Sequence, residues 1–262
     1  MVQYSDFESA SAQEVLSWAL PTFGNSLAIS TSFQKEGMVV IDMAARIDPK
    51  VRVFTIDTGR LPEETHQMME TVRQRYGIPV EIVFPEASEV ESMIAAHGPN
   101  LFYRGVPLRK LCCEIRKVRP MQRKLAGLQA WVVGLRRSQT ETRSQIRKVE
   151  SSDGTIKISP LADWTSEQVE AYTLQHNVPV HPLYAKGFPS IGCGPCTRAT
   201  FDCEDERAGR WWWERDEEKE CGIHIASNGR VTRGVDVLLS DVLASPPVFS
   251  QTALFPNSAE TR

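Results

Sequence analysis

Short apolar segments alternate with helical patterns along most of the chain. Runs rich in valine, isoleucine, leucine and phenylalanine occupy residues 26–31, 51–56, 80–84, 130–134 and 156–161. Between several of these runs, apolar residues recur at helical spacing, as over residues 38–45 and 88–97. Strands that alternate with helices predict an α/β fold, in which helices flank a parallel sheet and a ligand binds beyond the carboxyl ends of the strands.

Helix boundaries follow from proline and from capping residues. A helix over residues 8–20 should end at Pro21, because proline cannot continue a regular helix. Proline also suits the first position of a helix, where its missing N–H costs nothing. Other expected helices begin at Pro62, begin at Thr165 with Gln168 as its capping-box partner, and cover residues 204–220 and 235–243.

Polar loops follow three of the predicted strands. The first leads directly into a helix, whose N-terminal N–H groups favour anions. None of the loops matches GxxxxGK[ST] or GxGxxG, so ordinary strand-to-helix connections and an exposed basic loop remain alternatives to an anion site. The candidate ligand contacts are Ser30, Ser32 and Phe33 in the first loop, Asp57, Thr58, Gly59 and Arg60 in the second, and Gly134, Arg136 and Arg143 in the third.

The overall composition limits the partners. The 262 residues carry a formal charge of −3, so no global charge attracts nucleic acid or an anionic membrane. The sequence does not open with a basic segment followed by an apolar one, and no apolar run approaches the roughly 18 residues that span a bilayer. We therefore expect a cytoplasmic protein of one α/β domain without a nucleic-acid or membrane partner.

Six cysteines in a reducing compartment favour metal binding or catalysis over disulfides. Cys193 and Cys196 form a CxxC pair, and Cys112 and Cys113 are adjacent. Four thiolates suit tetrahedral zinc or an iron–sulfur cluster. Structural zinc sites more often use two spaced pairs, so the adjacent cysteines favour a cluster, with zinc or a pair of small buried residues as the alternatives. Basic neighbours would offset the negative charge of a cluster: Arg109, Lys110, Arg116 and Lys117.

Arginines and tryptophans follow the CxxC pair. In the helix predicted over residues 204–220, Arg207 and Arg210 share one face with Glu214, so they would bind a doubly anionic substrate or pair within the helix. The tryptophans at 211–213 are expected to pack in the core rather than to stack on bases. Cys203 is expected to be a small buried residue, and structural roles are expected for His66, His176 and His181.

A lone cysteine, Cys221, stands three residues before His224. Its acidic neighbours would raise the pKa of a thiol, so a nucleophilic role requires cations from elsewhere in the fold. By side-chain chemistry alone, a catalytic role and an inert one are equally supported.

Four motifs occur in a fixed order: CCEIRK at 112–117, CGPC at 193–196, RAGRWWW at 207–213 and ECGIH at 220–224. Over residues 26–224 the chain resembles the assimilatory adenylyl-sulfate (APS) reductases of the APS/PAPS reductase family. The resemblance implies a Rossmann-like sheet of the adenine nucleotide alpha hydrolase-like (PP-loop) type. It also implies thioredoxin-dependent reduction of APS to sulfite and AMP, in which Cys221 attacks the APS sulfur and becomes an S-sulfocysteine.

The same resemblance implies roles for individual residues. A [4Fe–4S] cluster would be held by Cys112, Cys113, Cys193 and Cys196. Lys117 would link cluster and substrate, and His224 would stand beside the nucleophile. Phosphosulfate would be bound by Arg143, Arg207 and Arg210, and the nucleotide by the loops at 57–60 and 134–139. Thioredoxin or a glutaredoxin-like protein would supply electrons, and self-association into a homo-oligomer is compatible with this scheme.

The resemblance also divides the chain. Residues 1–25 form an N-terminal helical segment, residues 26–210 the nucleotide-binding domain with the cluster, residues 211–224 a mobile catalytic segment, and residues 225–262 an extension without an assigned role. The alternatives are a PAPS reductase, a PP-loop nucleotide-activating sulfurtransferase or ATP pyrophosphatase, and a non-enzymatic iron–sulfur or zinc regulator.

Overall fold

The computed structural model describes residues 4–140, 143–152, 154–214 and 233–244. Their strands form one six-stranded sheet in the order β3-β2-β1-β4-β6-β5. All neighbours are parallel except β5 and β6, which form an antiparallel pair at one edge. The strands are β1 Leu27–Ser30, β2 Val53–Ile56, β3 Val80–Val83, β4 Ala130–Val133, β5 Val149–Ser152 and β6 Thr155–Ile158. The predicted parallel α/β sheet is therefore confirmed.

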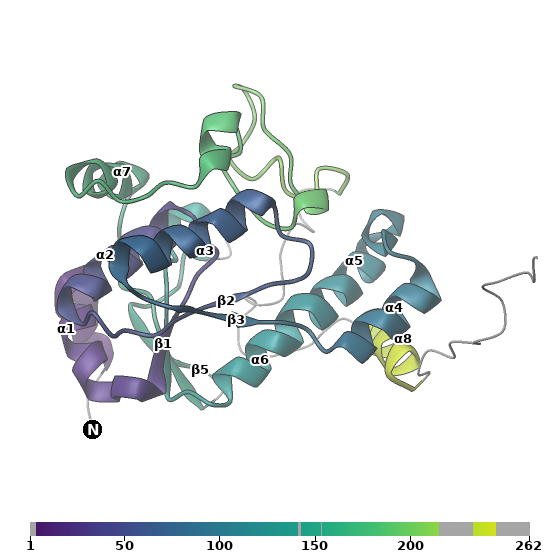
Figure 1. The fold of residues 1–262 in the computed structure, drawn as a ribbon, viewed down its shortest axis with the longest axis horizontal. Coiled ribbons are helices and arrows are strands. Elements are labelled where there is room, and N and C mark those ends of the chain that lie inside the picture. The colour runs from purple at the N-terminus through teal and green to yellow at the C-terminus, as the bar shows by residue number, and fades with distance from the viewer. Residues whose placement is uncertain (1–3, 141–142, 153, 215–232, 245–262) are drawn as a thin grey trace, which may run out of the picture.

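Helices cover both faces of the sheet (Figure 1). One face packs on α1, α2, α3 and α7, and the other face packs on α6. Side chains alternate between the two faces, since Leu27 and Ile29 enter the first core and Ala28 enters the second. The α-helices are α1 Ala12–Phe23, α2 Lys35–Ile47, α3 Glu63–Tyr76, α4 Ala87–His97, α5 Val106–Cys113, α6 Arg119–Leu125, α7 Ser166–Gln175 and α8 Arg233–Ala244.

A third core lies beside the sheet and contains the cysteine motifs. It joins α4, α5 and α8 to the cysteines and tryptophans, with Leu111, Trp211 and Val242 at its centre. Figure 1 shows α8 beside α4, at the end of the molecule where α5 begins. The helix expected over residues 235–243 is thus confirmed, and it packs against the domain although it lies in the extension after residue 224.

The cysteine helix is one continuous helical run with a change of pitch. A π-helical turn at Glu114–Val118 joins α5 to α6, and Pro120 lies in the first turn of α6. Proline has no N–H to donate to the preceding turn, and the change of pitch just before it accommodates this loss. A π-turn in an α-helix is rare and is frequently found at functional sites. Here it carries Arg116 and Lys117.

Several predicted boundaries were wrong. Pro21 does not end α1, which runs to Phe23 and is closed by the Gly24 N–H donating to the Leu20 carbonyl. Pro62 is the residue before α3 rather than its first residue. The capping box at Thr165 and Gln168 is confirmed by hydrogen bonds in both directions.

A helix was predicted over residues 204–220. The prediction was wrong for residues 204–214, and residues 215–220 lie outside the described part of the chain. Turns occupy this stretch, because its charged residues pair outside any helix. Glu204 pairs with Arg198 at 2.6 Å, and Glu214 pairs with Arg109 at 2.8 Å. Cys203 is exposed, which contradicts its expected burial.

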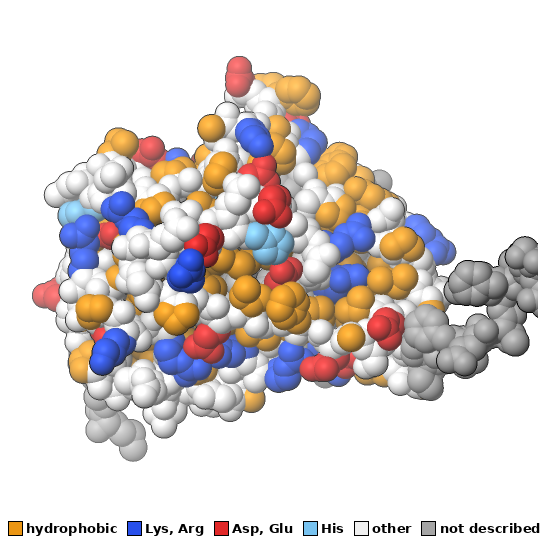
Figure 2. All heavy atoms as spheres, viewed as in Figure 1, with side chains coloured by type: hydrophobic (Ala, Val, Ile, Leu, Met, Phe, Trp, Pro, Cys, Tyr) orange, Lys and Arg blue, Asp and Glu red, His pale blue; other side chains and the backbone are white. Residues whose placement is uncertain are grey.

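Charges of both signs are intermixed over the face seen in Figure 2, and hydrophobic side chains form a band across its middle. Exposed Ile82 and Phe84 belong to the edge strand β3 and the residue that follows it. Within the described residues, no helix has the length and apolar character needed to cross a membrane.

Candidate active site

The main cavity lies where the strand order reverses. The chain runs from β1 outward to β2 and β3, then returns to place β4 on the other side of β1. The loops after β1 and β4 therefore diverge and leave a crevice, which is where ligands bind in open α/β sheets. A cavity of about 340 Å³ opens there. Its lining includes residues 30–32 and 34–37 after β1, residues 133–136 at the end of β4, and residues 189–192, 206, 207, 210 and 211.

The loop after β1 is shaped by its own side chains. The Thr31 hydroxyl accepts a hydrogen bond from the Phe33 N–H at 2.9 Å. Phe33 has φ of 58° and is fully buried in the core, so it anchors the loop and does not line the cavity. Ser30 and Ser32 do line it. The N-terminus of α2 faces the same space, where its N–H groups favour an anion.

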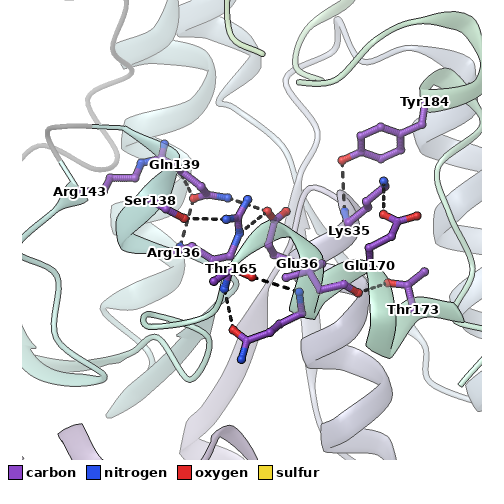
Figure 3. Close-up of polar contacts among 12 residues, drawn as sticks. Lys35, Glu36, Arg136, Ser138, Gln139, Arg143, Thr165, Glu170, Thr173 and Tyr184 are labelled. Atoms are coloured by element: carbon purple, nitrogen blue, oxygen red, sulfur yellow. Dashed lines mark hydrogen bonds and ion pairs between the residues drawn. The ribbon is translucent and has the colours of Figure 1, made fainter. Parts of the chain in front are cut away.

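A buried ion pair joins the loops after β1 and β4. Arg136 Nε donates to Glu36 Oε1 at 2.9 Å, and Gln139 Nε2 donates to the same oxygen at 3.0 Å (Figure 3). Both charged side chains are nearly buried, with exposures of 5% and 13%. Gly134 permits this approach, because a Cβ there would lie 2.7 Å from the Gly37 nitrogen. Glu36 thus offsets the charge of Arg136, which was predicted to bind the ligand.

A second ion pair, Lys35–Glu170, also lines the cavity. Lys35 Nζ donates to Glu170 Oε2 at 2.6 Å, and its N–H donates to the Tyr184 hydroxyl at 3.3 Å. Figure 3 shows these residues apart from the group around Arg136. Burial raises the pKa of Tyr184, with the charge of Glu36 as the next cause, so this hydroxyl stays protonated.

Three more arginines of the prediction line the same cavity. They are Arg143, Arg207 and Arg210, and Lys117 adds a further cation. Arg143 Nη1 donates to Gln139 Oε1 at 2.7 Å, and Arg210 Nη1 donates to the Ile191 carbonyl at 3.3 Å. Several guanidinium groups around one cavity suit a ligand with more than one negative charge.

Arg210 is placed by the loop that contains the CxxC pair. A Cβ at Gly192 would lie 2.3 Å from Arg210 Nη2, so only glycine leaves room for this guanidinium. Thr197 and Arg210 also form an isolated antiparallel bridge. The arginine therefore reaches the cavity from turns held against the CxxC loop, and not from the predicted helix face.

The four predicted metal ligands meet at a second, small cavity. It is lined by Cys112, Cys113, Cys193 and Cys196, together with Thr58, Arg60, Phe102, Arg109, Arg116, Lys117 and Pro195. Adjacent and CxxC cysteines from two distant segments thus share one site. Lys117 lines both this cysteine cavity and the main cavity, so it stands between them.

Electrostatics at the cysteine cavity favour either protonated thiols or bound metal. Burial raises the pKa of Cys112 to about 11. Burial and the neighbouring Cys193 and Cys112 raise that of Cys196 to about 12. The charges of Arg116, Lys117 and Arg210 act in the opposite direction. Thiolates crowded into an apolar site need such compensation, which metal ions also provide.

The donor set fits an iron–sulfur cluster. One zinc ion would require sulfurs drawn to about 2.3 Å from a common centre. A cluster binds each cysteine at a separate iron, so four cysteines that line one cavity are a donor set able to hold it.

The loop after β2 faces the cysteine cavity. Thr58 and Arg60 line that cavity, and Thr58 Oγ1 lies 3.2 Å from Cys193 Sγ. Asp57 Oδ1 accepts from the Gly59 N–H at 2.8 Å, and its other oxygen pairs with His66 Nε2 at 2.8 Å. The predicted nucleotide contacts of these four loop residues remain predictions, and His66 has a carboxylate partner that the sequence did not indicate.

The other two histidines contact structural neighbours. His181 is buried, accepts from the Leu183 N–H at 3.2 Å and lies 3.1 Å from the Thr65 hydroxyl. His176 packs its ring on Tyr172 at 4.1 Å. Cys221 and His224 lie outside the described residues, so their predicted roles rest on the sequence.

Comparison with known proteins decides the family. Residues 26–199 match the model of the phosphoadenosine phosphosulfate reductase domain. The chain belongs to this family. It is 45% identical over 202 residues to adenosine 5'-phosphosulfate reductase of Allochromatium vinosum, which spans 76% of this chain and 79% of that protein. The enzyme of the same name from Pseudomonas aeruginosa is 41% identical over 232 residues, or 85% of each chain.

Solved structures support the same family and fold. The phosphate complex of phosphoadenylyl-sulfate (PAPS) reductase from Candida auris gives a TM-score of 0.64 at 32% identity, covering 76% of this chain and 98% of that one. FMN adenylyltransferase from Candida glabrata gives a TM-score of 0.52 at 14% identity, covering 91% and 88% of the two chains. The second likeness shows the fold alone. The expected PP-loop type of architecture is thus confirmed.

Proposed function

We propose that this chain is an adenylyl-sulfate reductase, an oxidoreductase that converts APS to sulfite and AMP in sulfate assimilation. The observation that carries the proposal is Lys117, which lines both a cation-rich cavity at the switch point of the sheet and a cavity formed by four cysteines. The first cavity suits a nucleotide with a phosphosulfate group. The second suits the metal centre of the iron–sulfur type of reductase.

Nucleotide binding is assigned to the main cavity. The β1 loop and the N-terminus of α2 present hydroxyl and N–H groups to it. Arg143, Arg207 and Arg210 would bind the phosphosulfate oxygens, where their positive charge stabilises AMP as it leaves. Arg136 would act mainly by holding the two loops together, since Glu36 accepts its hydrogen bond.

Cys221 is the proposed nucleophile. Its thiolate would attack the APS sulfur, and the bond from that sulfur to the bridging phosphate oxygen would break. AMP leaves with the electron pair of that bond, and the enzyme keeps an S-sulfocysteine. Lys117, Arg207 and Arg210 would supply the positive charge that the acidic neighbours of Cys221 do not. His224 would stand beside the thiol.

Electrons would come from a dithiol protein such as thioredoxin or a glutaredoxin-like protein. One of its thiolates attacks Cys221 Sγ and displaces sulfite, which forms a mixed disulfide. Its second thiol then breaks this bond, restores the Cys221 thiol and leaves the partner oxidised by two electrons. The cycle therefore balances without any other reductant.

The four cysteines Cys112, Cys113, Cys193 and Cys196 would hold a [4Fe–4S] cluster. When bound, that cluster would supply fixed charge beside Lys117 rather than the electrons of the reaction. The thiol of Cys193 is oriented by Thr58, and Arg116 is fixed by donating to the Thr58 carbonyl at 2.7 Å. These residues would thereby set the electrostatic environment of the centre.

PAPS is the second candidate substrate. The family model and the Candida auris structure carry its name. APS is preferred because curated relatives at 40–45% identity are named for it, and because the full cysteine set of the iron–sulfur type is present.

The proposed intermediate can be trapped. Wild-type protein incubated with APS and no thiol should gain the mass of one SO₃ group on the peptide that contains Cys221. A Cys221→Ser variant should gain none, make no sulfite and keep the iron content of the wild type. Full sulfite production by Cys221→Ser would exclude this mechanism.

A further inference from the structure

A buried Arg–Glu pair lies beside the cysteine cavity, which Arg109 lines. Arg109, on α5, is 1% exposed, and Glu214 has a side-chain exposure of 3%. Arg109 Nη2 donates to Glu214 Oε2 at 2.8 Å, and its Nε donates to Glu214 Oε1 at 3.1 Å. Such two-point contacts fix the plane of the guanidinium as well as its position. A buried pair of this kind contributes little net stability over apolar residues, so its value lies in geometry.

Trp211 connects this pair to the substrate side. The Arg109 guanidinium lies over the Trp211 ring at 4.6 Å from its centroid, and the Arg210 guanidinium lies over the same ring at 4.8 Å. Trp211 is 2% exposed, and its backbone N–H donates to the Cys196 carbonyl at 3.1 Å. Arg109 lines the cysteine cavity, and Arg210 lines the main cavity. One indole thus contacts a cation from each cavity.

The backbone of Trp211 is strained. Its φ of 44° lies in the left-handed region, which a bulky aromatic residue rarely adopts. Such a conformation persists only where the surroundings hold it in place. The contacts that hold it here are the cation–π contact of Arg109, the fixed Glu214 three residues later, and the hydrogen bond to the CxxC loop.

From this arrangement we infer that Arg109, held by Glu214, is a positioning residue that acts through Trp211 to orient Arg210 toward the phosphosulfate group of the substrate. The inference rests on the proposed function for the identity of that group. It adds two residues, Arg109 and Glu214, to the substrate side of the enzyme. It also gives the strained conformation of Trp211 a role.

The test uses a double variant, because removal of one partner would leave a buried charge. Arg109→Met with Glu214→Leu replaces the pair by apolar side chains of similar volume in the anaerobically purified full chain. A matched control, Arg119→Met with Glu89→Leu, removes another two-point Arg–Glu pair, which joins α6 to α4 and lines neither cavity.

The measurements are the dissociation constants of AMP and adenosine by calorimetry, together with iron content and thermal midpoint. AMP should bind about tenfold more weakly to the double variant, because a displaced arginine loses most of its contact with phosphate. Adenosine binding, iron content and midpoint should match the wild type, and the control should match it in every respect.

An Arg210→Ala background separates positioning from general damage. If Arg109 acts through Arg210, the double variant should cause no further loss of AMP affinity in that background. An equal tenfold loss there, unchanged AMP affinity in the wild-type background, or a parallel loss of adenosine affinity would each overturn the inference. If the double variant shows no folding transition, Trp211→Phe replaces it, because phenylalanine keeps a ring under Arg210. Its AMP affinity should lie between those of the wild type and of Arg210→Ala, and an AMP affinity equal to that of the wild type would overturn the inference.

This test is independent of turnover. The proposed function fails if the wild-type enzyme makes no sulfite from APS. The positioning role fails only if AMP binding does not respond as described.

Discussion

The two cavities that meet at Lys117 differ in how the chain builds them. The main cavity is the larger of the two, and its cations come from segments separated by a hundred residues and more. Two of these cations, Arg136 and Lys35, are paired with Glu36 and Glu170. The cysteine cavity is small, and burial raises the thiol pKa values within it. The first is suited to bind and release a charged ligand. The second is suited to hold one centre permanently.

This difference predicts the largest effect at the cysteine cavity. Cys196→Ser should remove bound iron and sulfide almost completely, because a hydroxyl is a poor ligand for a cluster of this kind. AMP affinity should stay within a few-fold of the wild type, because the main cavity has its own residues. Metal analysis and calorimetry on one preparation check both statements. A strong loss of AMP affinity would show that AMP binding depends on the cysteine cavity and would contradict the independence of the two cavities.

Lys117→Ala should affect the reaction without removing the metal. The ammonium group stands at the boundary of both cavities, where developing negative charge on the leaving group would be stabilised. We expect kcat/KM for APS to fall about 10²–10³-fold, the range for loss of one preorganised electrostatic group. Iron content should be unchanged. If the iron content fell in proportion to the activity, Lys117 would be needed to hold the metal centre, and its proposed role at the substrate would be contradicted.

Gly134→Ala should perturb the main cavity alone. The added Cβ would lie 2.7 Å from the Glu36 carbonyl carbon and the Gly37 nitrogen, both backbone atoms that cannot move freely. The β4 loop and the start of α2 must then separate, and the Arg136–Glu36 pair with them. We expect the KM for APS to rise about tenfold, whereas iron content stays constant. Gly127→Ala, at a position with an ordinary contact distance of 3.7 Å, is the control.

Val242→Ala should destabilise the core around the cysteines. Val242 is 2% exposed on α8, whereas Leu243 beside it is 44% exposed. Loss of buried methyl groups with a residual cavity should cost about 1–2 kcal/mol. The free energy of unfolding of Leu243→Ala should equal that of the wild type within about 0.5 kcal/mol. Urea titrations measure both free energies of unfolding. Equal losses of stability in Val242→Ala and Leu243→Ala would contradict the packing of α8 through Val242.

The smallest expected effect is on the pH dependence of stability, through His181. This residue contacts Thr65, which lines the main cavity. Burial lowers its pKa, and its Nδ1 accepts the Leu183 N–H, so the folded state favours the neutral ring. Below the ordinary pKa of about 6.5, the unfolded chain binds a proton that the folded chain resists. Stability should therefore fall as the pH drops through this region. Calorimetric scans should show a smaller acid shift of the thermal midpoint in His181→Gln.

Local motifs could be predicted, and long-range pairs could not. The spacing of Cys112, Cys113, Cys193 and Cys196 indicated one site, because ligand chemistry is encoded in residue type and spacing. The Arg136–Glu36 and Lys35–Tyr184 contacts join residues 100 and 149 positions apart, and no local pattern marks them. Strand β5 was missed because its sequence VESS is mostly polar, as suits a sheet edge.

Tertiary contacts also overrode one strong local pattern. Residues 204–214 have the composition of an amphipathic helix, yet Arg198 and Arg109 bind Glu204 and Glu214 from outside it. The strained Trp211 backbone is a consequence that propensity cannot show. Sequence reasoning thus found Arg207 and Arg210 of the main cavity but placed them on a helix, whereas they lie in turns.

The most direct test of the central claim combines metal analysis with substrate choice. The chain is purified without oxygen, its iron and acid-labile sulfide are measured, and sulfite release from APS and from PAPS is followed with thioredoxin. We predict close to four irons and four sulfides per chain, with sulfite formed from APS in clear preference to PAPS. Colourless protein that contains zinc, or protein that reduces only PAPS, would contradict the account.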